Sequence, residues 1–216
     1  MHDAVLFDLD GTLLDTLDDL ADAMNAVLAA EGLPTHPTDA YRHFVGDGVV
    51  ALARRAVGAD RADDERFVDH VVARMRAEYA DRWDAKTRPY DGVAALLDAL
   101  TDRGVRRAVL SNKPHDTTCL CVTGLLGRWT FDAVRGVSDA TPRKPEPAGA
   151  LAIARELGIP PERWLYVGDT NTDMRTAAAA GMYAAGAVWG FRDADELTAA
   201  GANALAQTPT DVLELL

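Results

Sequence analysis

The chain lacks the compositional features that mark several classes of protein. Of its 216 residues only two are cysteines, and aromatic residues make up 6%. The cysteines, Cys119 and Cys121, are too close in sequence for an ordinary disulfide and lack the second pair of ligands that a zinc site would need. This scarcity excludes a disulfide-dense module and fits a reducing compartment, so we expect a cytoplasmic protein.

Positive charge and long hydrophobic runs are also scarce. Lys and Arg number 22 against 34 Asp and Glu, which gives a formal net charge of −12 at pH 7. Such a chain repels phosphate backbones at long range, so we expect no nucleic-acid partner. The longest weakly polar stretch, residues 177–191, falls short of the ~20 apolar residues that a membrane-spanning helix needs. The opening segment carries charges within its short apolar run, unlike a signal peptide, so we expect a soluble protein with no membrane partner.

The remaining composition is that of a folded globular protein, with 48% hydrophobic and 26% charged residues. Short apolar runs that end at Gly, Asp, Asn or Ser predict four buried strands, Ala4–Leu9, Arg107–Leu110, Trp164–Val167 and Tyr183–Val188. Segments with apolar residues at helical spacing, each ended by a glycine, alternate with these strands. The alternation predicts an α/β fold with a doubly wound parallel sheet of the Rossmann-like type.

One long segment interrupts this alternation. Residues 16–86 contain no convincing strand pattern and instead show three apolar stripes at helical spacing, within residues 17–28, 49–57 and 68–79. Thr16 is the expected N-cap of the first helix, with Asp19 as an acid of its first turn. Three amphipathic helices can bury their stripes against one another. We therefore predict a core of residues 1–14 and 89–216, with residues 15–88 inserted as an all-helical domain.

Polar residues follow the predicted strands at the ends where a parallel sheet binds ligands. These residues are Asp8, Asp10 and Gly11 after the first strand, Ser111 and Asn112 after the second, and Asp169 and Asp173 after the third, with Lys144 in the segment between the second and third. Because the carboxyl ends of parallel strands share one edge, we expect these side chains to form one site.

The chemistry of this set indicates a metal ion and a phosphate group. Carboxylates 4 Å apart repel by ~4 kcal/mol per pair at an effective dielectric constant of 20, so a cluster of them favours a bound cation. A hard ion such as Mg²⁺ suits oxygen ligands. Lys144, Ser111 and the backbone N–H groups of Gly11 and Asn112 could offset the charge of an anionic substrate.

Each motif alone also has an ordinary structural interpretation. Asp8-Leu9-Asp10-Gly11 is a common turn sequence, residues 111–114 could be a plain loop, and Lys144 could be a solvated side chain. The run from Asp169 to Asp173 imitates the start of a calcium loop, but Met174 stands where that loop needs glycine, which excludes it. The order of the motifs and their positions after the strands favour a single site.

Together these motifs resemble those of the haloacid dehalogenase superfamily of phosphohydrolases over nearly the whole chain. The first motif of that family corresponds to Asp8-Leu9-Asp10-Gly11-Thr12-Leu13, the second to Ser111, the third to Lys144, and the fourth to Gly168-Asp169 with Asp173. The all-helical insert resembles the family's cap domain. Within the family, residues 44–49, 111–114 and 189–192 resemble phosphoglycolate phosphatases.

The resemblance implies a magnesium-dependent phosphatase. By analogy, Asp8 is the nucleophile that forms an aspartyl-phosphate, and Asp10 is the general acid and base. The implied Mg²⁺ ligands are Asp8, the backbone carbonyl of Asp10, and Asp169, with Asp173 as either a ligand or a partner of a ligand. Ser111 and Lys144 are the implied phosphate-binding side chains, and the implied reaction is 2-phosphoglycolate to glycolate.

The substrate follows from the resemblance alone and has alternatives. A small phosphorylated metabolite is the expected partner, and the loop Gly46-Asp47-Gly48 of the cap is expected to swing over the site, although Asp47 is unfavourable for an anion. A sugar-phosphate mutase or a pyrophosphatase could share the same core, as could a non-catalytic binding protein, since a fold alone does not confer activity. Either a monomer or a homodimer is compatible with the sequence.

Overall fold

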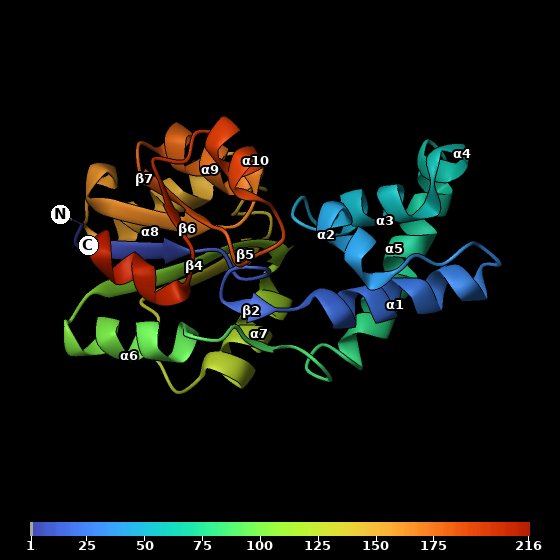
Figure 1. Ribbon diagram of the computed structural model, residues 1–216. Coiled ribbons are helices and arrows are strands. Elements are labelled where there is room, and N and C mark those ends of the chain that lie inside the picture. Colours follow the sequence, from blue (N-terminus) through green and yellow to red (C-terminus); the bar gives the residue numbers. More distant parts are fainter. Residues whose placement is uncertain (1) are drawn as a thin grey trace. The chain divides into compact units, whose positions relative to one another are not determined.

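The computed structural model describes residues 2–216 and separates the chain into two compact units (Figure 1). One unit contains the chain up to Asp15 together with Pro89–Leu216, and the other contains Thr16–Arg88. The connections between them include the strands β2 (Leu14–Asp15) and β3 (Arg88–Pro89), which pair as a two-stranded sheet.

The first unit is built on a sheet of six parallel strands. In spatial order they are β5 (Ala133–Val137), β4 (Arg106–Pro114), β1 (Ala4–Phe7), β6 (Trp164–Gly168), β7 (Tyr183–Ala187) and β8 (Ala204–Ala206). The register aligns Phe7 of the central strand with Val109 of β4 and with Val167 of β6. These three strands therefore bring the residues that follow Phe7 and Val167 to one edge of the sheet.

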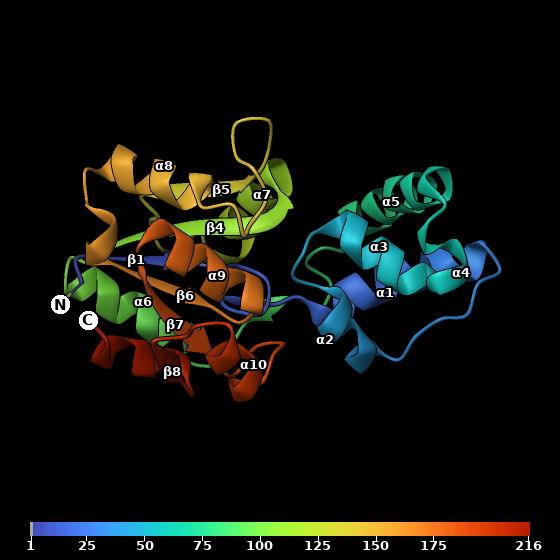
Figure 2. The ribbon, with the colours of Figure 1, turned by 90° about the horizontal axis from the view of Figure 1, so that it is seen from above.

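Helices cover both faces of this sheet (Figure 2). One face carries α6 (Val93–Asp102), α7 (His115–Leu126) and the short helix η3 (Pro209–Glu214). The other face carries α8 (Ala148–Leu157), α9 (Asn171–Ala180) and α10 (Ala194–Ala199). The short helix η2 (Pro161–Arg163) leads into β6. The chain moves outward from β1 through β4 to β5 and then returns to β6 on the opposite side of β1. Such a reversal is where open α/β sheets bind ligands. The predicted doubly wound parallel sheet is confirmed.

The strands differ from the prediction at the edges and in β4. The prediction missed β5 and β8: β5 includes Arg135 and Gly136, which break an apolar run, and β8 has only three residues. The predicted strand Arg107–Leu110 is too short, because β4 continues to Pro114, with a shift of register between Leu110 and Pro114. Pairing with β5 on one side extends the strand beyond its apolar part.

The second unit contains only helices between Leu17 and Ala80, a segment that is described throughout. They are α1 (Leu17–Ala30), η1 (Thr38–Ala40), α2 (Tyr41–Phe44), α3 (Val49–Val57), α4 (Ala59–Ala62) and α5 (Glu65–Ala80). The three predicted stripes correspond to α1, α3 and α5, which pack against one another, and Met24, Val27, Val68, Val71 and Met75 are buried between them. The apolar stripes thus account for the core of this unit.

The start of α1 is fixed differently from the expectation. Thr16 occupies the N-cap position, but its side chain makes no capping hydrogen bond. Asp19 is buried and accepts hydrogen bonds from the backbone N–H groups of Lys86 and Thr87 and from Oγ1 of Thr87, at 2.7–3.1 Å. This carboxylate therefore ties the first turn of the helical unit to the segment through which the chain leaves it.

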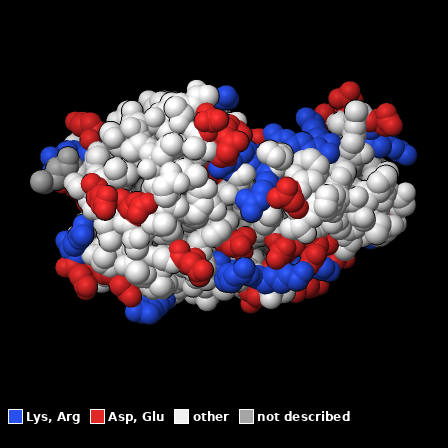
Figure 3. Space-filling view, in the orientation of Figure 1, with Lys and Arg blue, Asp and Glu red and all other residues white. Residues whose placement is uncertain are grey.

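The surface is charged and mixed. Acidic and basic side chains are interspersed on the face shown in Figure 3. Some form ion pairs, such as Arg54 with Glu65 and Arg106 with Asp132. Within residues 2–216, each helix is too short or too polar to cross a bilayer.

Candidate active site

The site begins in the turn that follows the central strand. The N–H of Asp8 donates to the carbonyl of Val167, which carries the pairing of β1 with β6 one residue further. Gly11 has φ +83°, and a Cβ at this position would lie 2.2 Å from Oδ2 of Asp169, so only glycine fits. The N–H of Gly11 donates to the carbonyl of Leu14 at 2.9 Å. In the structure this N–H therefore forms a hydrogen bond within the turn, whereas the sequence predicts that it donates a hydrogen bond to a phosphate group.

Lys144 joins two of the expected carboxylates. Its Nζ lies 2.9 Å from Oδ1 of Asp8 and 2.7 Å from Oδ1 of Asp173. The side chains are almost inaccessible to solvent, with exposed fractions of 2% for Lys144, 7% for Asp8 and 0% for Asp173. Charged hydrogen bonds of this kind are strong where water is excluded, so Lys144 and Asp8 hold each other in place.

Asp173 is positioned by the first turn of α9. Its carboxylate accepts hydrogen bonds from the N–H and Oγ1 of Thr170 through Oδ2, while the N–H of Asp173 donates back to Thr170 Oγ1 in a capping box. Tyr166 donates its hydroxyl to Oδ1 at 3.2 Å. A Cβ at Gly168 would lie 2.4 Å from Cβ of Asp173, so the end of β6 must be glycine for the helix to approach this closely.

Asp169 is enclosed by groups from two loops. Thr12 Oγ1 donates to its Oδ1 at 2.8 Å, and the N–H of Phe191 donates to its Oδ2 at 2.9 Å. A Cβ at Gly190 would lie 2.3 Å from Cβ of Asp169, so the loop after β7 passes directly against this side chain. Trp189 Nε1 donates to the carbonyl of Thr12 and joins the same two loops. The carboxylate is therefore held rigidly.

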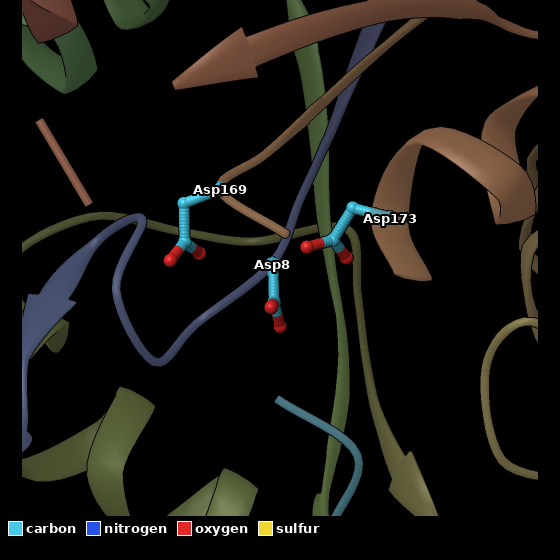
Figure 4. Close-up of side chains that lie close together, drawn as sticks. All are labelled: Asp8, Asp169 and Asp173. Carbon is cyan, nitrogen blue, oxygen red and sulfur yellow. The ribbon is translucent and has the colours of Figure 1, made fainter. Parts of the chain in front are cut away.

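These contacts gather three carboxylates into one buried group (Figure 4). Asp8, Asp169 and Asp173 each offer an oxygen, and the three oxygens lie within 4.8 Å of one another. They come from the end of β1, the loop after β6 and the first turn of α9. Ionised, the group carries three negative charges, and Lys144 offsets one of them. A divalent cation would balance the remaining two, and an all-oxygen donor set suits a hard ion such as Mg²⁺.

The pKa values show how unfavourable this crowding of buried charge is. Burial raises the pKa of Asp8 well above its usual value, with the charges of Asp173 and Asp169 adding to the effect and Lys144 opposing it. Burial, together with the charge of Asp173, raises the pKa of Asp169 to about 7. Burial lowers the pKa of Lys144, but the charges of Asp173 and Asp8 outweigh it, so the pKa rises well above normal and the ammonium stays charged.

Asp10 faces a different cation. Nζ of Lys113 donates to its Oδ1 at 2.9 Å, and the two side chains are 5% and 14% exposed. The carboxylate of Asp10 is not one of the three clustered carboxylates. The two aspartates of the first motif thus have separate lysine partners, which the sequence did not predict.

Ser111 and Asn112 lie in the last part of β4, the neighbour of β1. Oγ of Ser111 is buried and accepts a hydrogen bond from the N–H of Lys113 at 3.2 Å. The side-chain amide of Asn112 binds the backbone of Lys144 in both directions, accepting from its N–H at 2.8 Å and donating to its carbonyl at 3.2 Å. The Asn112 side chain therefore places the segment that carries Lys144.

Several residues of the site have no role assigned in the sequence prediction. Thr12, Lys113, Tyr166 and the N–H of Phe191 all bind aspartates of the site. Thr12 lies within the first motif, and Phe191 lies within residues 189–192, which resemble a motif of the family. The sequence therefore marks both segments but does not indicate what these two residues bind. No pattern in the sequence indicates a role for Tyr166, because a tyrosine in a buried strand cannot be distinguished from an ordinary core residue.

Comparisons with known proteins identify the family to which the chain is similar. The family model of the haloacid dehalogenase-like hydrolases matches residues 2–181. A phosphoglycolate phosphatase of Rhodospirillum rubrum is 41% identical over 188 residues, which cover 84% of this chain and 78% of that protein. A phosphoglycolate phosphatase of Pseudomonas putida is 35% identical over 190 residues, covering 87% of this chain and 70% of the other.

A solved structure shares the architecture throughout. A protein from Lactobacillus delbrueckii subsp. bulgaricus, described as a candidate phosphoglycolate phosphatase, superposes with a TM-score of 0.93 at 30% sequence identity. The match covers 100% of this chain and 98% of that one. The similarity therefore extends over both the sheet unit and the helical unit.

Proposed function

The chain belongs to the haloacid dehalogenase-like hydrolase family, and on this basis we propose that it is a magnesium-dependent phosphatase that converts 2-phosphoglycolate to glycolate. The sequence-based identification of this family and of a hydrolytic enzyme is confirmed by the family match, and the names of the relatives agree with a phosphoric monoester hydrolase. The alternative of a non-catalytic binding protein is set aside.

One observation carries the proposed mechanism: a buried aspartate at the end of the central strand, in contact with a buried lysine and two further carboxylates. Asp8 is proposed to be the nucleophile that attacks an approaching phosphoryl group. Asp169 and Asp173, with Asp8, are the side chains that would hold Mg²⁺. When bound there, Mg²⁺ would supply positive charge that keeps the carboxylates ionised and offsets the charge of the phosphoryl oxygens.

The reaction has two steps. First, an oxygen of Asp8 attacks phosphorus, the bond from phosphorus to the ester oxygen breaks, and Asp10 gives its proton to the leaving oxygen. A water molecule then attacks the phosphorus of the aspartyl-phosphate. Asp10 takes a proton from this water, the bond from phosphorus to Asp8 breaks, and inorganic phosphate leaves. Lys144 and the hydroxyl of Ser111 are proposed to bind the phosphoryl oxygens during both steps.

The helical unit is proposed to act as a cap that excludes bulk water during the reaction. The loop Gly46-Asp47-Gly48 of this unit was expected to reach the substrate, with Asp47 as an obstacle to an anion. Arg55 pairs with Asp47, its Nη2 lying 2.5 Å from Oδ2, and also donates to the carbonyl of Phe44 at 2.9 Å. This pairing offsets part of the charge of Asp47, which supports an anionic substrate.

A panel of phosphate monoesters tests the proposal. Purified protein assayed with Mg²⁺ should release phosphate from 2-phosphoglycolate faster than from hexose phosphates or pyrophosphate, and EDTA should abolish the release. Asp8→Asn should eliminate turnover while circular dichroism shows an unchanged fold, because the amide cannot form the acyl phosphate.

The same panel separates the alternatives. Isomerisation of a hexose phosphate without phosphate release would identify a mutase, and preference for pyrophosphate would identify a pyrophosphatase. Near-normal turnover by Asp8→Asn would contradict the aspartyl-phosphate mechanism.

A further inference from the structure

The chain uses arginine as its ordinary cation and lysine at only three positions, against 19 arginines. Two of the three lysines, Lys113 and Lys144, are buried with their ammonium groups on aspartates of the site. The third, Lys86, is exposed to solvent and pairs with Asp22. Two of the three lysines thus lie in the site. The ammonium group of lysine is compact, whereas the guanidinium group of arginine is broad and planar.

The two buried lysines serve opposite sides of the reaction. Lys144 contacts Asp8, the proposed nucleophile, and therefore lies on the side of the phosphoryl group. Lys113 contacts Asp10, the proposed proton donor to the leaving oxygen, at 2.9 Å. Its backbone is fixed as well, because its N–H donates to Ser111 Oγ and its carbonyl accepts from Thr118 Oγ1. Lys113 consequently lies on the side of the leaving group.

Geometry then limits what Lys113 can reach. A general acid must lie about 2.6–3.2 Å from the oxygen that it protonates. The leaving oxygen and the Lys113 ammonium are therefore both within hydrogen-bond distance of the same Asp10 carboxylate. In the phosphate ester of a 2-hydroxy acid, one carbon atom separates the ester oxygen from the carboxylate. A carboxylate in that position comes within reach of the ammonium.

We propose that Lys113 is a specificity residue that binds the carboxylate of the leaving group and so selects phosphate monoesters of 2-hydroxy acids. This inference rests on the proposed phosphatase function and assigns a residue to its substrate preference. A substrate carboxylate brought to this group of buried aspartates would be repelled without a cation. Lys113 supplies that cation in a place shielded from water, where a charge-assisted hydrogen bond is strong. An ester without the carboxylate gains nothing from Lys113 in this way.

The test compares two substrates of nearly equal shape. The kinetics of wild type and Lys113→Met are measured with Mg²⁺ on 2-phosphoglycolate and on the phosphate ester of glycolamide, in which a neutral amide replaces the carboxylate. Lys113→Met should lose at least tenfold more kcat/KM on 2-phosphoglycolate than on the amide, about 1.4 kcal/mol, with most of the difference in KM. Lys113→Arg should retain part of the preference.

Equal losses on the two substrates would overturn the proposal, since they would mean that Lys113 acts only by positioning Asp10. Lys86→Met is the matched control, because it removes the exposed lysine of the helical unit, and it should leave the ratio of the two substrates unchanged. Circular dichroism checks that each variant is folded.

A measurement on the wild type needs no variant at all. Wild-type enzyme should prefer 2-phosphoglycolate to the amide ester by at least tenfold in kcat/KM. Hydrolysis of both esters without preference would overturn the inference about Lys113 and leave the phosphatase function standing. Hydrolysis of neither ester, nor of any other monoester of the panel, would instead overturn the function itself.

Discussion

Removal of divalent metal should make the folded protein lose stability as the pH rises from about 4 to 7. The reason is the buried group of Asp8, Asp169 and Asp173, whose three charges are opposed by Lys144. Without a metal ion, protonation relieves the repulsion at low pH. At neutral pH these carboxyl groups must either ionise where they are buried or keep their protons, and both cost free energy.

The size of the effect follows from Asp169. Its pKa in the folded protein is about 7, against an ordinary value of 3.8. Because the folded state holds this proton more tightly than the unfolded state, its contribution to stability is complete below pH 3.8 and is lost as the pH rises through about 7. The difference between 3.8 and about 7 corresponds to a loss of about 4 kcal/mol, at about 1.36 kcal/mol for each pH unit. Asp8 acts in the same direction, since burial raises its pKa too.

Urea unfolding followed by circular dichroism measures this loss. Samples in EDTA between pH 4.5 and 8 would be compared for wild type and Asp169→Asn, because the amide removes the titrating group. The free energy of unfolding should fall with pH in the wild type and fall less steeply in the variant. Excess Mg²⁺ at pH 7.5 should restore stability to the wild type, by about 2.7 kcal/mol at a hundred times its Kd.

The exposed Asp102→Asn is the control, and its pH profile should follow that of the wild type. The reasoning is refuted if metal-free wild type has the same free energy of unfolding at pH 5 and pH 7.5, or if Asp169→Asn keeps the full slope. Either result would mean that the three carboxylates do not destabilise the fold, and the argument for a divalent ion would lose its physical basis.

Two further substitutions probe the same site. Gly190→Ala should cost about 1–3 kcal/mol of stability by overpacking, because its Cβ would overlap Asp169. It should also weaken Mg²⁺ binding at least tenfold in calorimetry, whereas Gly104→Ala, at an open position, should leave the Mg²⁺ affinity unchanged. Equal Mg²⁺ affinities of wild type and both variants would contradict the contact between Gly190 and Asp169. Lys144→Met should lower kcat/KM at least tenfold, about 1.4 kcal/mol, because Asp8 loses its ammonium partner, and a variant with unchanged kinetics would place Lys144 outside the reaction.

The central part of the fold could be predicted because its strands are buried on both faces. Ala4–Phe7 and Trp164–Gly168 are continuous apolar runs, and short runs of this kind that end at glycine or aspartate are typical of buried parallel strands. Once the strands are parallel, the residues after them must meet at one edge. This rule alone brings Asp8 and Asp169 together from positions far apart in the chain, and the structure shows their carboxylates in one group.

The remaining contacts depend on loops whose paths have no periodic signal. The loop containing Gly190 and Phe191 passes against Asp169 because glycine leaves room there, and a glycine in a sequence does not reveal which side chain it touches. In the same way, Asn112 looks like a phosphate ligand in sequence, while its side chain binds the backbone of Lys144. Polar residues near a site thus include both ligands and residues that hold ligands in place.

Charge gives a physical reason for the two lysines of the site. The chain carries a net charge of −12, and Asp8, Asp10, Asp169 and Asp173 add to the negative potential at the place where an anionic substrate must bind. With all four carboxylates ionised, Lys113 and Lys144 offset two of these charges, and a divalent cation would offset the other two. In that state, loss of either lysine would leave an excess of negative charge that opposes the binding of phosphate. For that reason the cost of removing Lys113 should depend on the charge of the substrate, whereas removal of the surface residue Lys86 should not.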